Sequence, residues 1–75
     1  NTVVAHLSLD HNERAMELLA TMPKDAVTEY LRAIACSRLG RKAEGRRHFL
    51  EACRLDERME YRGNLDPEIA ELLKQ

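Results

Sequence analysis

The residues of this chain best suited to chemistry are three histidines and two cysteines. His6, His11 and His48 lack the i,i+4 spacing that holds two imidazoles on one helix face around a metal ion. Cys36 and Cys53 are far apart and add no close pair of ligands. His48 precedes Cys53 at a spacing that turns it off the same helix face, so no base is placed beside that thiol. We therefore expect no metal or cofactor, and two free thiols buried in the core.

Carboxylates and glycines give no catalytic pattern either. The pairs Glu57/Glu60 and Glu68/Glu71 have the spacing of solvent-facing helix residues, where carboxylates ordinarily serve helix stability and solubility. A phosphate-binding loop needs clustered glycines, and the glycines here are isolated at Gly40, Gly45 and Gly63. We expect a protein that is not an enzyme.

Charge argues against a nucleic-acid partner. The chain has a formal net charge of −1, with an isoelectric point near 6.3, so no global attraction to phosphate exists. One segment is locally basic, with Glu44 as its only acid. A solvated turn and helix face explains it better than an anion, acidic-peptide or RNA contact, because no aromatic side chains interleave for base stacking. Its basic residues are Arg38, Arg41, Lys42, Arg46 and Arg47.

Size and composition predict one small helical domain. The chain has 75 residues, 44% hydrophobic and 33% charged, which is too apolar for a disordered tail. No apolar run reaches the length of a membrane span, so we expect no membrane insertion. The chain does not begin with Met, and its first residues already look structural, so we expect a segment of a larger protein. The cellular compartment is not predicted.

Apolar spacing and capping residues predict a series of helices and no strand. Asp10 with Glu13 has the spacing of a capping box, Asp25 and Asp66 suit helix starts, and Gly40 suits a left-handed helix end. The predicted segments are residues 2–9, residues 13–22 before Pro23, residues 26–39, a helix from about Lys42 through Cys53, a turn over residues 57–62 closed by Gly63, and a final helix from Pro67 with Ile69, Leu72 and Leu73 facing inward.

Small and apolar residues recur about thirty positions apart. Ala5 and Leu9 return as Ala35 and Leu39, and Ala15 and Leu19 have Gly45 and Phe49 at the matching places. Internal periods of this order indicate stacked supersecondary units.

The second of these units resembles a tetratricopeptide repeat. Ala33, Gly40, Phe49, Ala52 and Leu55-Asp56 occupy that family's places for a small residue, the turn glycine, an aromatic residue, alanine and the closing Leu-Asp. A weaker repeat precedes it, with Asn1, Val3, Leu9, Asp10, Ala15, Leu19 and Met22 at the corresponding places and Asp10 at that of the turn glycine. The spacing is four residues shorter than the family's usual 34, and Pro23 accounts for the early end.

The resemblance implies an all-α superhelix of antiparallel helical hairpins. Residues 1–24 would form a partial first repeat, residues 25–57 a second repeat, and residues 58–75 a linker turn and a capping helix. Within the second repeat, we expect Ala33 and Gly45 to let two helices approach closely.

In the resembled family, the first helices of successive hairpins line a concave peptide groove. That implies a noncatalytic module that binds a peptide or protein segment, with apolar burial by Tyr30 and Ile34 and orientation by Arg38. The alternative is a structural end-cap or scaffold segment, with the same residues buried against a neighbour; exposed repeat ends would also allow a homo-oligomer. The residues on this inner face are Val4, Leu7, Ser8, Tyr30, Ile34, Ser37 and Arg38.

Overall fold

Six α-helices make up the described part of the chain, and the prediction of an all-α protein is confirmed. The computed structural model describes residues 2–74, without the side chains of Thr2 and Val4, and it contains no strand in that range. No helix within residues 2–74 combines the length and apolar character needed to cross a bilayer. The helices are α1 (Thr2–Ser8), α2 (Asn12–Ala20), α3 (Ala26–Arg38), α4 (Lys42–Leu55), α5 (Arg58–Asn64) and α6 (Pro67–Leu73).

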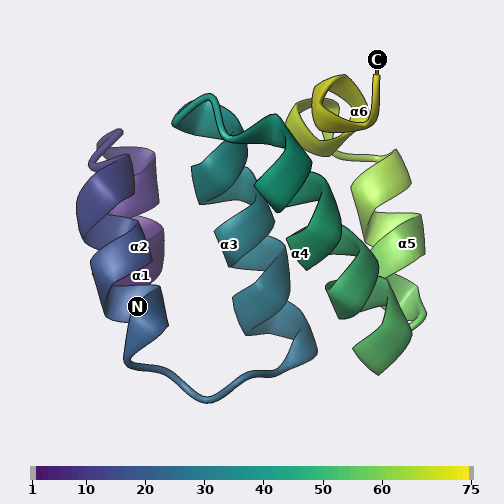
Figure 1. The fold of residues 1–75 in the computed structure, drawn as a ribbon, viewed down its shortest axis with the longest axis horizontal. Coiled ribbons are helices and arrows are strands. Elements are labelled where there is room, and N and C mark those ends of the chain that lie inside the picture. Colours follow the sequence, from purple (N-terminus) through teal and green to yellow (C-terminus); the bar gives the residue numbers. More distant parts are fainter. Residues whose placement is uncertain (1, 75) are drawn as a thin grey trace.

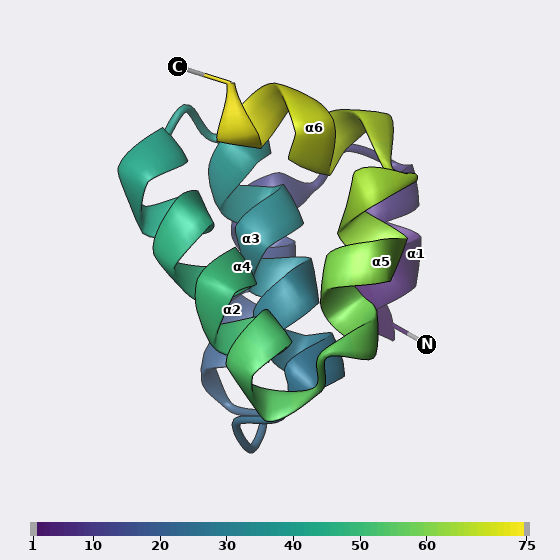
Figure 2. The ribbon, with the colours of Figure 1, turned by 90° about the vertical axis from the view of Figure 1, so that its right-hand side faces the viewer.

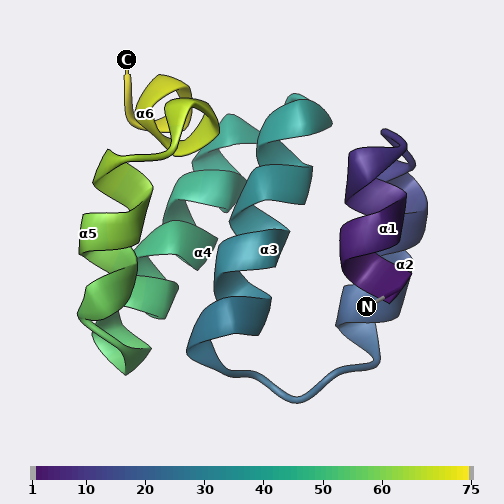
Figure 3. The ribbon, with the colours of Figure 1, turned by 180° about the vertical axis from the view of Figure 1, so that it is seen from behind.

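The helices are arranged as a row around a central α3–α4 hairpin (Figure 1). The α1–α2 pair lies on one side of this hairpin and packs on it through α2 and α3, as the reverse view also shows (Figure 3). On the other side, α5 packs against α4 and α3. Helix α6 turns across the end of the hairpin and contacts α3, α4 and α5 (Figure 2).

Two apolar clusters fill the spaces between these helices. One joins α3 and α4 to α5 and α6, and within it the rings of Tyr30 and Phe49 meet edge to face with centroids 6.1 Å apart. The other joins α1 and α2 to α3. Ile34 packs against both clusters from the middle of α3. Helix α3 is therefore the element that connects the two halves of the molecule.

Three predicted helix boundaries are confirmed, two by hydrogen bonds and one by its backbone angle. The Asp25 carboxylate accepts a bond from the Thr28 amide at 2.8 Å, and the Asp66 carboxylate accepts one from the Glu68 amide at 3.0 Å. Gly40 has φ +80° and ends α3 in the left-handed conformation. Free backbone groups at both kinds of helix end are thus satisfied locally.

The predicted capping role of Asp10 is wrong. Asp10 has φ +63° and ends α1 instead, while His11 precedes α2 and makes no side-chain capping bond within residues 2–74. Aspartate tolerates the left-handed conformation better than most residues. Asp10 therefore serves as the left-handed residue that ends α1 and not as the N-cap of α2. Two smaller expectations also differ: Gly63 lies inside α5, because the helix continues to Asn64, and Leu73 is 40% exposed, because only one side of α6 faces the hairpin.

The ends of α1 and α3 repeat one backbone pattern. The amides of Asp10 and His11 donate to the carbonyls of Leu7 and His6, at 3.1 and 2.7 Å. The same two bonds recur at the end of α3, where the amides of Gly40 and Arg41 donate to Ser37 and Cys36 at 3.2 and 2.8 Å. This paired bonding is the Schellman helix end. The residues that recur about thirty positions apart in the sequence are thus accompanied by the same backbone hydrogen bonds at the ends of α1 and α3.

The expected close approach of α3 and α4 at Gly45 is confirmed. A Cβ atom placed on Gly45 would lie 3.1 Å from the Ala33 carbonyl oxygen, 3.1 Å from a Leu72 methyl carbon and 3.4 Å from the Cys36 Cβ. The first two contacts are tight, and the first is with backbone. The position therefore needs a residue with almost no side chain.

We predict that Gly45→Leu destabilises the fold much more than Gly45→Ala. Alanine gains about 1 kcal/mol of helix propensity, which offsets part of its crowding, whereas leucine must separate α4 from α3 at a cost of about 1–3 kcal/mol or more. Urea denaturation of both variants and the wild type measures the free energies of unfolding. Equal losses in the two variants would show that the helices are not held together at this point.

Candidate functional site: the inner face of α3 and a polar cluster beside it

The predicted peptide-binding residue Tyr30 lies beneath α5 and α6. Its side chain is 1% exposed, and its hydroxyl donates to the Asp66 carboxylate at 2.7 Å. The guanidinium carbon of Arg62 lies 5.0 Å from the ring centroid, within the range of a cation–π contact. Burial, and then the bond to Asp66, raise the pKa of the Tyr30 hydroxyl. A peptide can reach this ring only if α5 and α6 move.

Arg38 is engaged by the same end of α6. Its guanidinium donates two bonds to the Glu68 carboxylate, at 2.9 and 2.5 Å, and a further bond to the Leu7 carbonyl at 2.5 Å. The Asn12 side-chain oxygen lies 3.4 Å from the same guanidinium. The two-point bond with Glu68 is the strong form of an arginine–carboxylate contact. Arg38 thus connects α3 to α6 and to the α1–α2 turn.

The remaining inner-face residues do not form one open groove with Tyr30. Leu7 is 7% exposed and belongs to the cluster that joins α1 and α2 to α3. Ile34 and Ser37 are half-buried on α3, and Ser8 is exposed at the end of α1. The side chain of Val4 lies outside the described part of the chain. The two polar anchors of the predicted site, Tyr30 and Arg38, therefore both bind the chain's own segment around Pro67.

The basic segment is divided between two environments. Arg46, predicted to point to water, donates to the Leu72 carbonyl at 3.2 Å and so supports α6. Helix α6 ends at Leu73, so the Leu72 carbonyl lacks a partner within the helix and is free to accept the bond from Arg46. Arg41, Lys42 and Arg47 are exposed. The segment is not one continuous basic surface.

A shallow hollow lies at the turn between α1 and α2. The rings of His6 and His11 are tilted there with centroids 5.7 Å apart, and the Nδ1 atom of His6 has no hydrogen-bond partner among the described residues. The hollow measures about 600 Å³ and is open to solvent. Its lining is His6, Asp10, His11, Asn12, Glu13, Arg14 and Leu39.

A polar cluster joins α3 to α4 on another side of the hairpin. Glu29 on α3 is 3% exposed, and its carboxylate receives a bond from Arg32 and lies 2.9 Å from the Nδ1 atom of His48. Burial opposes the charge on Glu29, but the bonds with His48 and Arg32 outweigh it and lower the pKa of this carboxyl. Glu29 is therefore a buried anion with two fixed partners.

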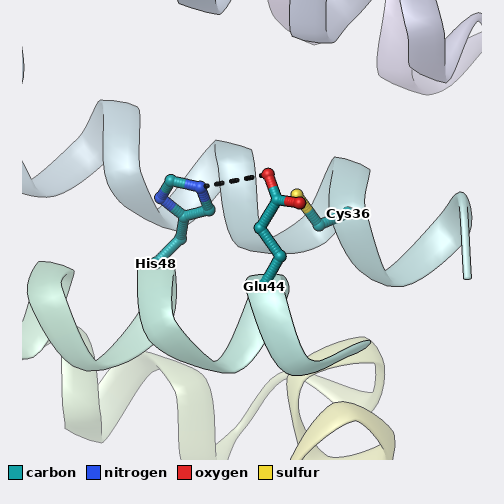
Figure 4. A group of neighbouring side chains, drawn as sticks. All are labelled: Cys36, Glu44 and His48. Carbon is teal, nitrogen blue, oxygen red and sulfur yellow. Dashed lines mark ion pairs between the residues drawn. The ribbon is translucent and has the colours of Figure 1, made fainter. Parts of the chain in front are cut away.

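The opposite edge of His48 faces Glu44 and Cys36 (Figure 4). Its Nε2 atom lies 3.8 Å from a Glu44 carboxylate oxygen, and ligand atoms of all three side chains lie within 4.8 Å of one another. Cys36 is fully buried, and burial followed by the charge of Glu44 raises the pKa of its thiol to about 11. A covered thiol that holds its proton is a poor nucleophile.

The sequence contained a partial signal for this cluster. Glu44 and His48 have the i,i+4 spacing that places two side chains on one helix face. The prediction of no metal site rested on the spacing of the histidines and cysteines alone, so it did not include the glutamate–histidine pair. The contribution of Cys36 from α3 depends on how the helices pack, and no spacing in the sequence reports that.

Comparison of the chain with protein-family models, curated proteins and solved structures finds no match.

We predict that Tyr30→Phe lowers the free energy of unfolding by about 1–3 kcal/mol, because it leaves the Asp66 carboxylate without a charge-assisted hydrogen bond. Tyr61→Phe is the matched control, since Tyr61 is 72% exposed, and it should change stability by less than about 0.5 kcal/mol. Thermal and urea denaturation measure both variants. Similar small effects would mean that the hydroxyl does not hold α6.

Proposed function

We propose that this chain is a noncatalytic scaffold segment of stacked helical hairpins, in which α5 and α6 cap one end. The observation that carries the proposal is the occupation of the α3 face by the chain itself. The Tyr30 hydroxyl donates to Asp66, the residue just before α6, and the Arg38 guanidinium donates to Glu68 in the first turn of α6. Both polar contacts are therefore made to the start of α6. A capping helix of this kind covers apolar surface that a further repeat would otherwise cover.

The tetratricopeptide-like part of this proposal draws support from two structural features. The ends of α1 and α3 share the same pair of backbone hydrogen bonds thirty residues apart. Gly45 also permits the close contact of α3 and α4 that the family's small residues provide between paired helices. Together they favour a succession of like hairpins over an unrelated helical bundle.

The surface available to an adjoining domain or to a second copy is the apolar exterior. Single exposed apolar residues are normal on a small protein, but here several lie along the row of helices. The contacts of α6 leave all of them exposed, so they are the apolar side chains that a neighbouring domain or copy would meet. They are Leu9, Val27, Leu50, Leu55, Tyr61 and Leu65.

The cap is tested by removing its anchors in the double variant Asp66→Asn/Glu68→Gln. We predict that the variant self-associates at least tenfold more tightly than the wild type, because a loosened α6 uncovers the apolar end of the stack. Sedimentation equilibrium over a range of concentrations measures this association. The control Glu60→Gln/Glu71→Gln makes the same change in charge at exposed positions, and equal association in both variants would contradict a capping role for α6.

A second candidate function, recognition of an acidic protein segment, is favoured by one observation. Tyr30 and Arg38 already hold a segment whose core is Asp66-Pro67-Glu68. A partner with similarly spaced carboxylates could bind the same face if it displaced α6. In that case the chain's own segment is a competitor for the partner.

A fluorescent peptide of residues 65–75 tests this second function. We predict weak binding to the wild type and at least tenfold tighter binding to Asp66→Asn/Glu68→Gln, because the competing intramolecular contact is weakened. Adding Arg38→Gln should abolish the gain, since the two-point bond is lost. Fluorescence anisotropy measures each affinity, and a peptide carrying the Asp66→Asn and Glu68→Gln changes is the control. Equal binding of both peptides would exclude recognition through these carboxylates.

A further inference from the structure

We propose that Cys36, Glu44 and His48 form a site for a divalent transition-metal cation, Zn²⁺ above all. One ligand atom from each side chain lies within 4.8 Å of the others, and His48 Nε2 lies 3.8 Å from a Glu44 oxygen (Figure 4). Bonds of about 2.0–2.3 Å in a tetrahedral zinc site place neighbouring ligand atoms about 3.3–3.8 Å apart. The three side chains need to close by only about 1 Å.

The orientation of His48 is that of a metal ligand. Its Nδ1 atom lies 2.9 Å from the Glu29 carboxylate, so a proton on Nδ1 is donated to that buried anion. The lone pair of Nε2 then faces the carboxylate of Glu44, and the sulfur of Cys36 lies beside that carboxylate (Figure 4). In zinc sites, the ring nitrogen of a histidine that does not bind the metal commonly donates its N–H to a carboxylate, which fixes the orientation of the imidazole.

The geometry of His48 and Glu44 leaves a place for a cation between them. With the proton on Nδ1, the Nε2 lone pair and the Glu44 carboxylate face each other as two acceptors at 3.8 Å. Either a second proton on the imidazole or a metal ion can lie between them. The proton is the competing occupant, and the experiment must separate the two.

The packing of the hairpin explains how the three ligands come together. Glu44 and His48 are one turn apart on α4, and Gly45 lies between them in sequence. Gly45 lets α4 approach α3 closely, because a Cβ there would be 3.1 Å from the Ala33 carbonyl oxygen, and Cys36 lies beside this point with its Cβ 3.4 Å from the same position. The contact that fixes the hairpin therefore also brings the sulfur to the glutamate and histidine.

Exposure and charge suit a cation that enters from solvent. The side chains of Glu44 and His48 are 40% and 25% exposed, and the sulfur lies beneath them. When the cation binds, the Cys36 thiol releases its proton to solvent. The thiolate then supplies one negative charge and Glu44 another, which a divalent cation cancels, while Arg32 balances Glu29. Mixed sulfur, nitrogen and oxygen ligands favour Zn²⁺ or Co²⁺ over Mg²⁺ or Ca²⁺. A fourth position is left for water or another ligand.

Co²⁺ is the spectroscopic probe for this site. Titration of the reduced full chain should give a thiolate-to-cobalt charge-transfer band together with the visible bands of a tetrahedral ion, and Zn²⁺ should displace both. Cys36→Ser should abolish the charge-transfer band. Cys53→Ser is the matched control, because Cys53 is the other free thiol and lies outside the cluster, and it should leave the band intact.

The remaining ligands are tested by Zn²⁺ calorimetry. Glu44→Gln and His48→Gln should each weaken binding at least tenfold, while His11→Gln should not change it. Glu44 is half-exposed, so its variant retains the fold even if Cys36→Ser is destabilised; circular dichroism checks this. Excess Zn²⁺ should also raise the wild-type Tm by several degrees, because the ion binds only the folded hairpin.

Three results would overturn the proposal. These are the absence of a charge-transfer band in the wild type, loss of the band in Cys53→Ser alone, or Zn²⁺ binding that is unchanged in both Glu44→Gln and His48→Gln. In the last case any bound ion is adventitious, and a protonated His48 bridging the two carboxylates is sufficient to explain the cluster.

Discussion

The close contact between α3 and α4 is the constraint on which the rest of the structure depends. With almost no side chain at Gly45, the backbone of α4 reaches the Ala33 carbonyl, and the two longest helices share a tight seam. The same approach brings Phe49 against Tyr30 and leaves space that Leu72 fills from α6. One missing side chain thereby affects the positions of the apolar core, helix α6 and the polar cluster.

The inner face of α3 is satisfied by the chain itself. Where the sequence suggested a ligand for Tyr30 and Arg38, the structure supplies Asp66 and Glu68. A buried hydroxyl and a guanidinium both need partners, and α6 provides them at its start, where Pro67 fixes the direction of the chain. The same chemistry that would recognise an acidic partner thus serves to position a helix.

Local signals predicted the local structure, and packing decided the remainder. Asp25, Gly40 and Asp66 could be interpreted from their neighbours alone, because capping and left-handed turns involve only nearby residues. The neighbours of Asp10 were compatible both with a helix N-cap and with a left-handed helix end. The burial of Tyr30 required knowledge of how α5 and α6 cross the hairpin, which no spacing encodes. The Glu44–His48 pair was visible at i,i+4, but its relation to Cys36 and Glu29 arises from a contact between two helices.

The repeated helix ends have a consequence for how the molecule opens. Asp10 adopts at the end of α1 a conformation that glycine adopts more readily at the end of α3, and the α1–α2 pair is attached to the hairpin mainly through α2. Helix α3, by contrast, is packed on both sides. Amide hydrogen exchange is therefore expected to be fastest in α1 and slowest in α3, with the first hairpin fraying while the second remains folded.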